Sequence, residues 1–414
     1  MSETPVSVVV VSRNRPQELS KCLKALRLQL YRTFEIIVVA DAAGCAAVSA
    51  LGLSDDIKIC RFSDPNISAA RNLGIDHAAG DIVAFIDDDA IAEPTWLANL
   101  TAPFECEDVA AAGGFVRGRN GISFQWKGEM VDRAGRSHNI DVAEVTVLRG
   151  NAMRAVKTQG TNCAFRRDLL VRLGGFDESY LYYMDETDLN LRIGAEGLAT
   201  AIVPDAEVQH LFAENTVRGP DRAPRSLFQI GASYAFFLRK RELGEEYWAE
   251  FANKQRARLV RAMVAGQLEP RDVDRLMRDL EEGRAAGDQR TPKLRNAFAS
   301  AAAFKPAFSA AAVPECRVIS GRRTARRKLF AQARALAAQG AIVTVFCFSA
   351  NAWFHKRWFH PDGFWVQSGG RFGKSSRCDP LLTFRSGVDR AKRELAAIRA
   401  VRGMREDAKI DASF

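Results

Sequence analysis

Three consecutive carboxylates, Asp87, Asp88 and Asp89, are the residues of this chain with the clearest capacity for chemistry. They close an apolar run, 82–86, which is typical of a strand buried on both faces of a parallel sheet. A carboxylate buried without a partner is costly, so this strand end needs solvent or a cation. In open α/β sheets, ligands bind beyond the carboxyl ends of the strands. Hard oxygen ligands there suit Mg²⁺ or Mn²⁺, and these cations suit a diphosphate. The alternative is a solvated acidic turn.

The elements that would position this acidic strand end alternate regularly along the chain. The pattern predicts strands at 6–11, 34–39, 57–62 and 82–86, and helices at 17–30 and 68–79. Strands and helices that alternate with short connections predict a parallel, doubly wound sheet. Asp41 ends the second strand, beside the first, where a base or a ribose could be read.

The composition is that of a large globular protein. The chain has 414 residues, of which 47% are hydrophobic and 26% are charged, enough for one large domain and a smaller one. It has no apolar run near the ~18–20 residues that a membrane-spanning helix needs, and its first residues lack the features of a secretory signal. Eight scattered cysteines without a Cys-x-x-Cys pair indicate reduced thiols. We therefore expect a cytoplasmic protein.

Charge divides the chain unevenly. Residues 251–414 hold 32 Lys+Arg against 15 Asp+Glu, a net charge of +17, whereas residues 1–250 carry a net charge of −8. We expect a large α/β domain at 1–250, a charged helical region with an Ala-rich linker at 251–312, and a small basic α/β appendage at 313–414.

The basic appendage has features that suit an anionic partner. Its expected helix carries an Arg-rich face, and aromatic and basic residues alternate over 353–360. Such a stretch suits an anionic membrane surface. Single-stranded nucleic acid, whose bases stack on aromatic rings, is a less expected partner. The alternative is an ordinary solvated basic domain.

Two longer segments carry a resemblance to a known family. Residues 67–90 read ISAARNLGIDHAAGDIVAFIDDDA, and residues 160–192 contain GTNCAFRR, GGFDE and DETDLNLR. With 6–16, 35–41 and His210, in this order, they resemble the family-2 glycosyltransferases of the GT-A fold. The resemblance implies a Rossmann-like, doubly wound, mostly parallel sheet that binds a nucleotide-diphosphate sugar.

The resemblance also implies roles for the acidic strand end. Asp89 would contact Mn²⁺ or Mg²⁺, Asp87 would share the metal and lie nearer the ribose, and Asp88 would be an acceptor behind them. Charge neutralisation on the departing diphosphate is what the chemistry needs at this place. In many members of the family a histidine at the place of His210 helps to hold the metal or the diphosphate. A plain surface or core histidine is the alternative.

Donor binding is expected to involve Asp41 and Arg71. The family usually shows two acidic residues where this chain has Ala40 and Asp41, so the identity of the base is not readable. The guanidinium of Arg71 can approach a nucleotide because small residues precede it. A structural ion pair between Arg71 and a carboxylate is the alternative.

The catalytic base is expected at Asp185 or Glu186. An acceptor hydroxyl must lose a proton as it attacks the anomeric carbon, which calls for a carboxylate opposite the diphosphate. The resemblance places that carboxylate at this pair, whose order is inverted relative to the family's common Glu-Asp. Alignment favours Glu186; Asp185 with a shifted backbone, or helix capping by both residues, are the alternatives.

We therefore expect an inverting, metal-dependent glycosyltransferase that uses a nucleotide-diphosphate sugar. The acceptor implied by the family is a glycan or a lipid-linked sugar for a bacterial surface polysaccharide, with the enzyme at the inner face of the membrane. The rival hypothesis is a non-catalytic nucleotide-sugar- or glycan-binding protein whose transferase site has decayed.

Overall fold

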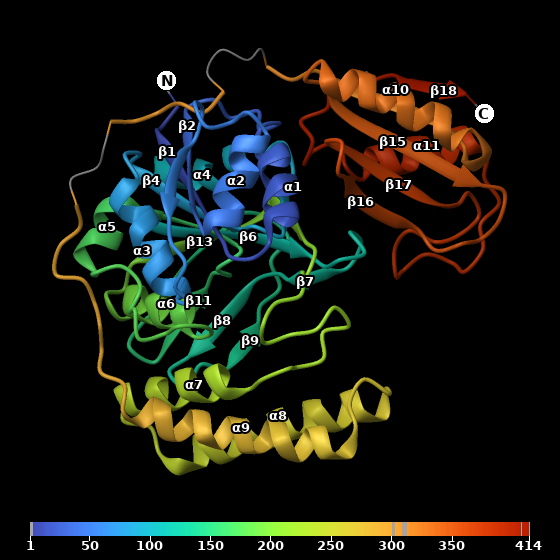
Figure 1. The fold of residues 1–414 in the computed structure, drawn as a ribbon. Helices are drawn as coiled ribbons and strands as arrows, with labels where there is room; N and C mark the ends of the chain where they lie inside the picture. The colour runs from blue at the N-terminus through green and yellow to red at the C-terminus, as the bar shows by residue number, and fades with distance from the viewer. Residues whose placement is uncertain (1–2, 300–302, 309–312, 407, 414) are drawn as a thin grey trace.

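The computed structural model describes residues 3–299, 303–308, 313–406 and 408–413. Its largest element is a ten-stranded sheet whose main path runs β10-β13-β6-β12-β4-β1-β2-β3. The four strands at one end are all parallel, and they are joined by helices on both faces (Figure 1). These strands are β1 (Val6–Ser12), β2 (Phe34–Ala40), β3 (Lys58–Arg61) and β4 (Ile82–Asp87). The α/β class predicted from the sequence is confirmed.

Helices cover both faces of the sheet, and each packs on it through its own apolar residues. One face packs against α1 (Pro16–Leu26), α2 (Ala42–Ala50) and α4 (Trp96–Thr101), and the other against α3 (Ile67–His77), α5 (Arg167–Arg172) and α6 (Asp185–Ala195). The helix predicted over 17–30 ends at Leu26 instead. Leu28 is still buried, but in the turn that leads to β2, so its apolar character marks core packing and not further helix.

The second half of the sheet is mixed, where a mostly parallel sheet was expected. The antiparallel strand β12 (Asn162–Arg166) lies between β4 and β6 (Val109–Arg117). The long strand β13 (Ala199–His210) then runs parallel to β6. The flanking strands are β5 (Ala90–Ala92), β7 (Phe124–Trp126) and β10 (Thr146–Arg149), and β8 (Glu129–Asp132), β9 (Ser137–Asn139) and β11 (Arg154–Lys157) form a separate three-stranded sheet. This arrangement brings the end of β13 beside the acidic end of β4.

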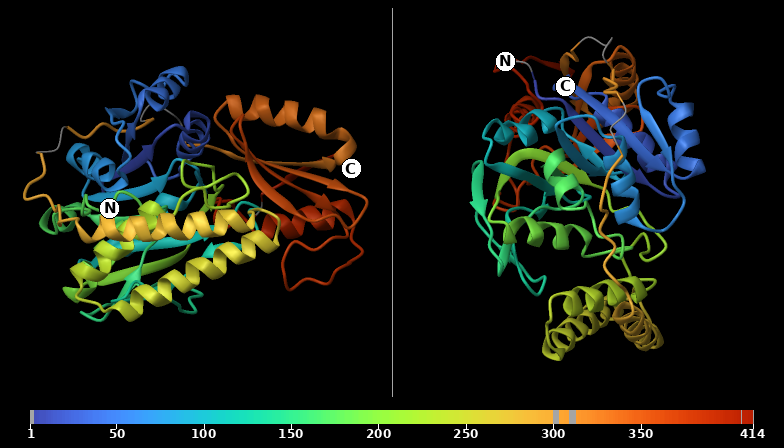
Figure 2. Two further views of the ribbon diagram at one scale, coloured as in Figure 1. Left: turned by 60° about the horizontal axis from the view of Figure 1, so that its bottom comes forward. Right: turned by 90° about the vertical axis from the view of Figure 1, so that its left-hand side faces the viewer.

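Three helices follow the sheet and pack together at one side of the molecule (Figure 2). They are α7 (Phe228–Lys240), α8 (Glu245–Val264) and α9 (Pro270–Asp288). Glycine lets α7 and α9 approach closely: a Cβ added to Gly283 would lie 2.1 Å from the carbonyl oxygen of Phe228. The described residues of the Ala-rich stretch at 297–312, namely 297–299 and 303–308, are not helical, and Phe308 packs on Phe34 of β2.

The C-terminal unit has its own five-stranded sheet in the order β16-β17-β15-β14-β18, drawn in orange and red in Figure 1. Its elements are β14 (Cys316–Arg322), the short η2 (Arg323–Ala325), α10 (Arg326–Ala338), β15 (Ile342–Ser349), β16 (Lys356–His360), β17 (Phe364–Gly370), α11 (Gly387–Ala396) and β18 (Ile410–Ser413). Helix α10 covers one face and α11 the other. The expected α/β appendage is thus present, and the domain boundaries stay a prediction.

A buried cluster of charges joins this unit to the main sheet. Glu93, just after β5, forms ion pairs with Arg357 of β16 and with Arg402, which follows α11. All three side chains are buried.

None of the helices in the described part of the chain is both long and apolar enough to cross a bilayer.

Candidate functional site

The three aspartates at the end of β4 point into different surroundings. Asp87 is the last residue of the strand, and its side chain is 32% exposed. Asp88 is fully buried, and Arg15 Nη2 lies 2.6 Å from its Oδ1. Burial raises the pKa of Asp88 well above its ordinary value, against the opposing effect of Arg15. Asp88 is therefore shielded from solvent and held by Arg15, and its expected role as an acceptor behind the metal stays a prediction.

Asp89 is buried too, but its two oxygens have separate partners. The backbone N–H of Ala213 donates to Oδ2 at 2.7 Å, and Arg15 Nη1 lies 3.3 Å from the same oxygen. The other oxygen, Oδ1, lies 3.2 Å from Nε2 of His210. Burial acts to raise the pKa of Asp89, but the contacts with His210, Arg15 and the Ala213 amide hold it below its ordinary value.

His210 is held firmly from three sides. It is the last residue of β13, and it pairs in register with Ala90 of β5, next to the aspartates. Its Nδ1 lies 3.2 Å from Oε1 of Gln125, and its ring packs against those of Trp126 and Phe212, with centroids 5.8 Å and 4.4 Å away. Without a cation, Nε2 can donate to Asp89; with a cation bound, a proton on Nδ1 directed at Gln125 would leave the lone pair of Nε2 for the metal.

These side chains fit a divalent cation. Asp87, Asp89 and His210 each offer one ligand atom, and these atoms lie within 4.8 Å of one another; this is the one such group among the described residues. Two carboxylates and an imidazole form a mixed oxygen and nitrogen donor set of the kind that a transition-metal ion accepts. Metal-binding histidines commonly donate their other N–H to a carbonyl oxygen, and Oε1 of Gln125 is placed to accept such a bond from Nδ1 of His210.

Arg71, Asp185 and Glu186 form a second cluster beside the first. The two carboxylates are the expected candidates for the catalytic base. Arg71 of α3 is ion-paired with Asp185, its Nη2 lies 3.6 Å from Asp87 Oδ1, and it donates to the carbonyl oxygen of Gly160 at 3.2 Å. Burial raises the pKa of Asp185 to about 8; Arg71 opposes this shift, and the neighbouring carboxylate of Glu186 adds to it. Arg71 thus links the acidic strand end to the first turn of α6.

Asp185 and Glu186 differ in how far their carboxylates are buried and paired. Asp185 is buried against Arg71, whereas Glu186 is partly exposed and forms no ion pair with any basic residue that the structure describes. The backbone just before them is strained, since Tyr183 and Met184 have φ angles of 74° and 70°. Strain of this kind persists only where surrounding structure imposes it, and it often marks a functional turn.

Asp41 is placed at the carboxyl end of β2, as predicted. It caps α2 by accepting the backbone N–H of Gly44 at 2.9 Å, and it accepts the backbone N–H of Asn14 at 2.7 Å. These bonds fix the loop after β1, from which Arg15 reaches the aspartates. A role in reading a base or a ribose stays a prediction.

Two residues of the site were not assigned from the sequence. Arg15 follows β1, which pairs in parallel with β4, so its position at the end of the neighbouring strand was a usable signal. Gln125 lies on the short strand β7, in a region without a clear period, and no sequence signal pointed to it.

Comparisons with known proteins bear on this arrangement. Residues 7–174 match the family model described as glycosyl transferase family 2. The glucosyl-dolichyl phosphate glucuronosyltransferase of Haloferax volcanii is 30% identical over 187 residues, which are 42% of this chain and 56% of that protein. The O-antigen biosynthesis protein RfbC of Myxococcus xanthus is 24% identical over 245 residues, 56% of this chain and 19% of that protein. The chain therefore spans only part of the length of these relatives.

Among solved structures, the mannosyltransferase PcManGT of Pyrobaculum calidifontis, in complex with GDP-Man and Mn²⁺, is 18% identical with a TM-score of 0.44. The alignment covers 70% of this chain and 89% of that one.

Proposed function

We propose, from the match of residues 7–174 to the family model described as glycosyl transferase family 2, that the protein is an inverting, metal-assisted hexosyltransferase. It takes a sugar from a nucleotide-diphosphate donor and transfers it to a glycan or lipid-linked acceptor. The observation that carries the proposal is the convergence of Asp87, Asp89 and His210 at the carboxyl end of β4, beside Arg71 and the carboxylates of α6.

Asp87, Asp89 and His210 would hold the cation. When bound, it supplies positive charge to the departing diphosphate. The nitrogen donor of His210 favours Mn²⁺ over Mg²⁺, which prefers oxygen ligands and water. Arg15 and Arg71 add fixed positive charge on either side, and the contacts of Asp41 hold the loop that carries Arg15.

Glu186 is the proposed base. The acceptor oxygen attacks the anomeric carbon while the bond from that carbon to the diphosphate oxygen breaks, and the hydroxyl proton passes to Glu186. One displacement inverts the anomeric carbon. Asp185 is a poorer candidate because its carboxylate is buried and already paired with Arg71. Its role is to position Arg71 and the start of α6.

A lipid-linked acceptor and a place on the inner face of the membrane complete the proposal. The name of the Haloferax relative describes transfer to a dolichyl-phosphate-linked sugar, and that of the Myxococcus relative describes O-antigen biosynthesis. The first name supports a lipid-linked acceptor, and the second supports a surface-glycan pathway. The rival, a binding protein with a decayed site, predicts donor binding without turnover.

The test is nucleoside-diphosphate release from a panel of UDP-, GDP- and dTDP-sugars with Mn²⁺. The wild type is expected to turn over one donor class. Glu186→Gln is expected to lower the rate about 10²–10⁴-fold, the usual contribution of a general base, and to leave donor affinity unchanged. Glu196→Gln, at the exposed end of the same helix, is the matched control.

Two results would contradict the proposal. If Asp185→Asn abolishes turnover while Glu186→Gln does not, the base assignment is wrong. If the wild type binds a donor but releases no diphosphate with any glycan or lipid-linked acceptor offered, the rival hypothesis holds.

A further inference from the structure

Five large apolar side chains stand exposed on two loops of the C-terminal unit. Trp353 and Phe354 lie between β15 and β16, and Leu381, Leu382 and Phe384 lie between β17 and α11. Phe354, Leu381 and Phe384 are each 80–81% exposed. Exposed apolar residues gathered in one place mark an interaction site, whereas single ones are ordinary.

The two loops form one surface because they are bonded to each other. Phe372 N–H of the second loop donates to the carbonyl oxygen of Asn351 at 3.1 Å, and Gly370 N–H, at the end of β17, donates to that of Trp353 at 3.0 Å. Within the second loop, the ring of Phe372 packs on that of Phe384, with centroids 5.4 Å apart. Figure 1 draws these loops at the lower edge of the C-terminal unit.

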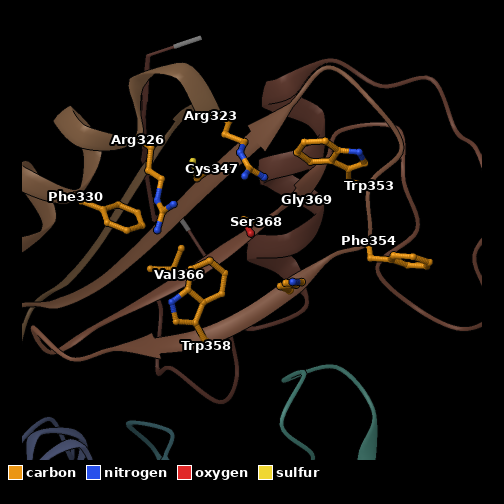
Figure 3. Close-up of a pocket in the computed structure, with 11 residues that line it drawn as sticks. Arg323, Arg326, Phe330, Cys347, Trp353, Phe354, Trp358, Val366, Ser368 and Gly369 are labelled. Atoms are coloured by element: carbon orange, nitrogen blue, oxygen red, sulfur yellow. The ribbon is translucent and has the colours of Figure 1, made fainter. Parts of the chain in front are cut away.

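A cavity of about 370 Å³ opens beside this surface. Figure 3 shows Arg323 of η2 and Arg326, the first residue of α10, directed toward it, with Trp358 on the opposite wall and Trp353 and Phe354 at its margin. The cavity contains no residue of the proposed transferase site. It is a second, separate place where this chain can hold a ligand.

The cavity is cationic and lacks a carboxylate. Arg323, Arg326 and Lys356 line it, and no acidic side chain does. These three bases are exposed, and none forms an ion pair with a carboxylate in the described parts of the chain. Arg323 lies over Trp353 at 4.7 Å and Arg326 over Phe330 at 4.8 Å, so aromatic rings hold the guanidinium groups in place.

The second loop extends the positive charge around the apolar residues. Lys374 and Arg377 lie on it without a carboxylate partner among the described residues. Its one acid, Asp379, is already ion-paired with Arg393 of α11. The surface therefore presents unpaired cations and bare hydrocarbon side by side, the combination that anionic bilayers bind.

We propose that the C-terminal unit docks on an anionic phospholipid bilayer, with Trp353, Phe354, Leu381, Leu382 and Phe384 in the interface and a lipid phosphate in the cavity lined by Arg323, Arg326 and Lys356. The chemistry of the apolar residues selects this partner over single-stranded nucleic acid. Two of the five are leucine, which offers no face on which a base can stack, and four of the five, the leucines and phenylalanines, carry no polar atom that could bond a base edge.

This inference rests on the proposed function, to which it adds the surface by which the protein would bind the membrane. Vesicle binding needs neither a donor nor Mn²⁺, and donor hydrolysis needs no vesicle. Failure of docking would therefore leave the transfer reaction intact, and failure of the transfer reaction would leave docking measurable.

The test is co-sedimentation of the full chain with two kinds of vesicle. One kind is phosphatidylcholine alone, and in the other about a third of the lipid is phosphatidylglycerol. The wild type is expected to bind only the anionic vesicles. Arg323→Gln with Arg326→Gln is expected to weaken binding roughly 30-fold, at about fivefold for each basic residue removed near the surface. Phe354→Ser with Phe384→Ser is expected to weaken it at least about tenfold.

Two matched control variants separate the effect of the cavity and the exposed loops from a general loss of charge or of surface apolar residues. Arg327→Gln with Lys328→Gln removes the same amount of charge from the first turn of α10, outside the cavity, and Val145→Ser alters an exposed apolar residue of the main sheet region. All these positions are exposed, so folding is expected to be preserved, and circular dichroism checks it. Equal binding to both vesicle types, or equal loss in the cavity variant and its control, would overturn the proposal. Tight binding of single-stranded RNA without vesicle binding would overturn it too.

Discussion

Replacing Glu93 by Gln tests the contact between the ten-stranded sheet and the sheet of the C-terminal unit, and among the predicted changes it has the largest expected effect on stability. Glu93 is buried between Arg357 and Arg402, with Arg402 Nε 2.9 Å from its Oε2. Glu93→Gln keeps the shape of the side chain and removes its charge, which leaves two buried guanidinium groups without an anion. Breaking a buried ion pair in this way typically costs about 3–5 kcal/mol.

The pKa of Glu93 gives an independent magnitude. Burial acts to raise this pKa, but the two arginines lower it from 4.5 to about 2. A difference of about 2.5 units at 1.36 kcal/mol per unit amounts to about 3 kcal/mol of folding free energy. Because the folded pKa is the lower one, this stabilisation is present above about pH 4.5 and is lost as the pH falls toward 2.

Scanning calorimetry at pH 7 and pH 4 measures the effect. About 3 kcal/mol is expected to lower the Tm of Glu93→Gln by about 12–24 °C if the C-terminal unit of ~100 residues melts alone, and by only a few degrees if the whole chain melts as one. The gap from the wild type is expected to narrow below pH 4.5. Glu315→Gln, an exposed partner of Arg317, is the control. A Tm for Glu93→Gln equal to that of Glu315→Gln would refute the reasoning.

Two further predictions concern the positioning of the site. Gln125→Leu removes the acceptor for His210 Nδ1 and is expected to weaken Mn²⁺ binding about 10–100-fold, measured by titration calorimetry with a nucleoside diphosphate present; unchanged Mn²⁺ affinity would argue against the orientation of His210. Gly74→Ala places a Cβ 2.4 Å from Val9 Cγ1, where α3 crosses β1, and is expected to cost about 1–3 kcal/mol in chemical denaturation. Gly118→Ala, whose nearest neighbour would be 3.6 Å away, is expected to be near neutral, and equal stability of the two variants would contradict the packing argument.

The local patterns of the sequence were enough for the framework of the site. An apolar run ending in Asp87, Asp88 and Asp89 predicted a strand end at the functional edge of an α/β sheet, because strand burial and topology follow from short-range pattern. The position of His210 beside Asp89 was implied only by the family resemblance. The physical cause, antiparallel pairing of β13 with β5, is visible only in the structure.

What the sequence could not supply are partners brought together by tertiary packing. Glu93 meets Arg357 and Arg402 across separations of 264 and 309 residues, and no local pattern encodes such pairs. Arg71 illustrates the same limit. The sequence left open whether it contacts a nucleotide or pairs with a carboxylate, and the structure pairs it with Asp185 while leaving it near Asp87. The antiparallel direction of β12 between β4 and β6 was not readable either, because the direction of a strand depends on tertiary topology and not on its own residue pattern.

The most direct test of the central claim is pulsed electron paramagnetic resonance of Mn²⁺ bound with a nucleoside diphosphate. The account predicts one Mn²⁺ per chain with a nitrogen coupling from imidazole, loss of that coupling in His210→Ala, and loss of tight binding in Asp89→Asn. Asp108→Asn, an exposed carboxylate remote from the site, is expected to behave as the wild type. If Asp89→Asn binds Mn²⁺ as tightly as the wild type, or the nitrogen coupling persists without His210, the proposed metal centre is wrong.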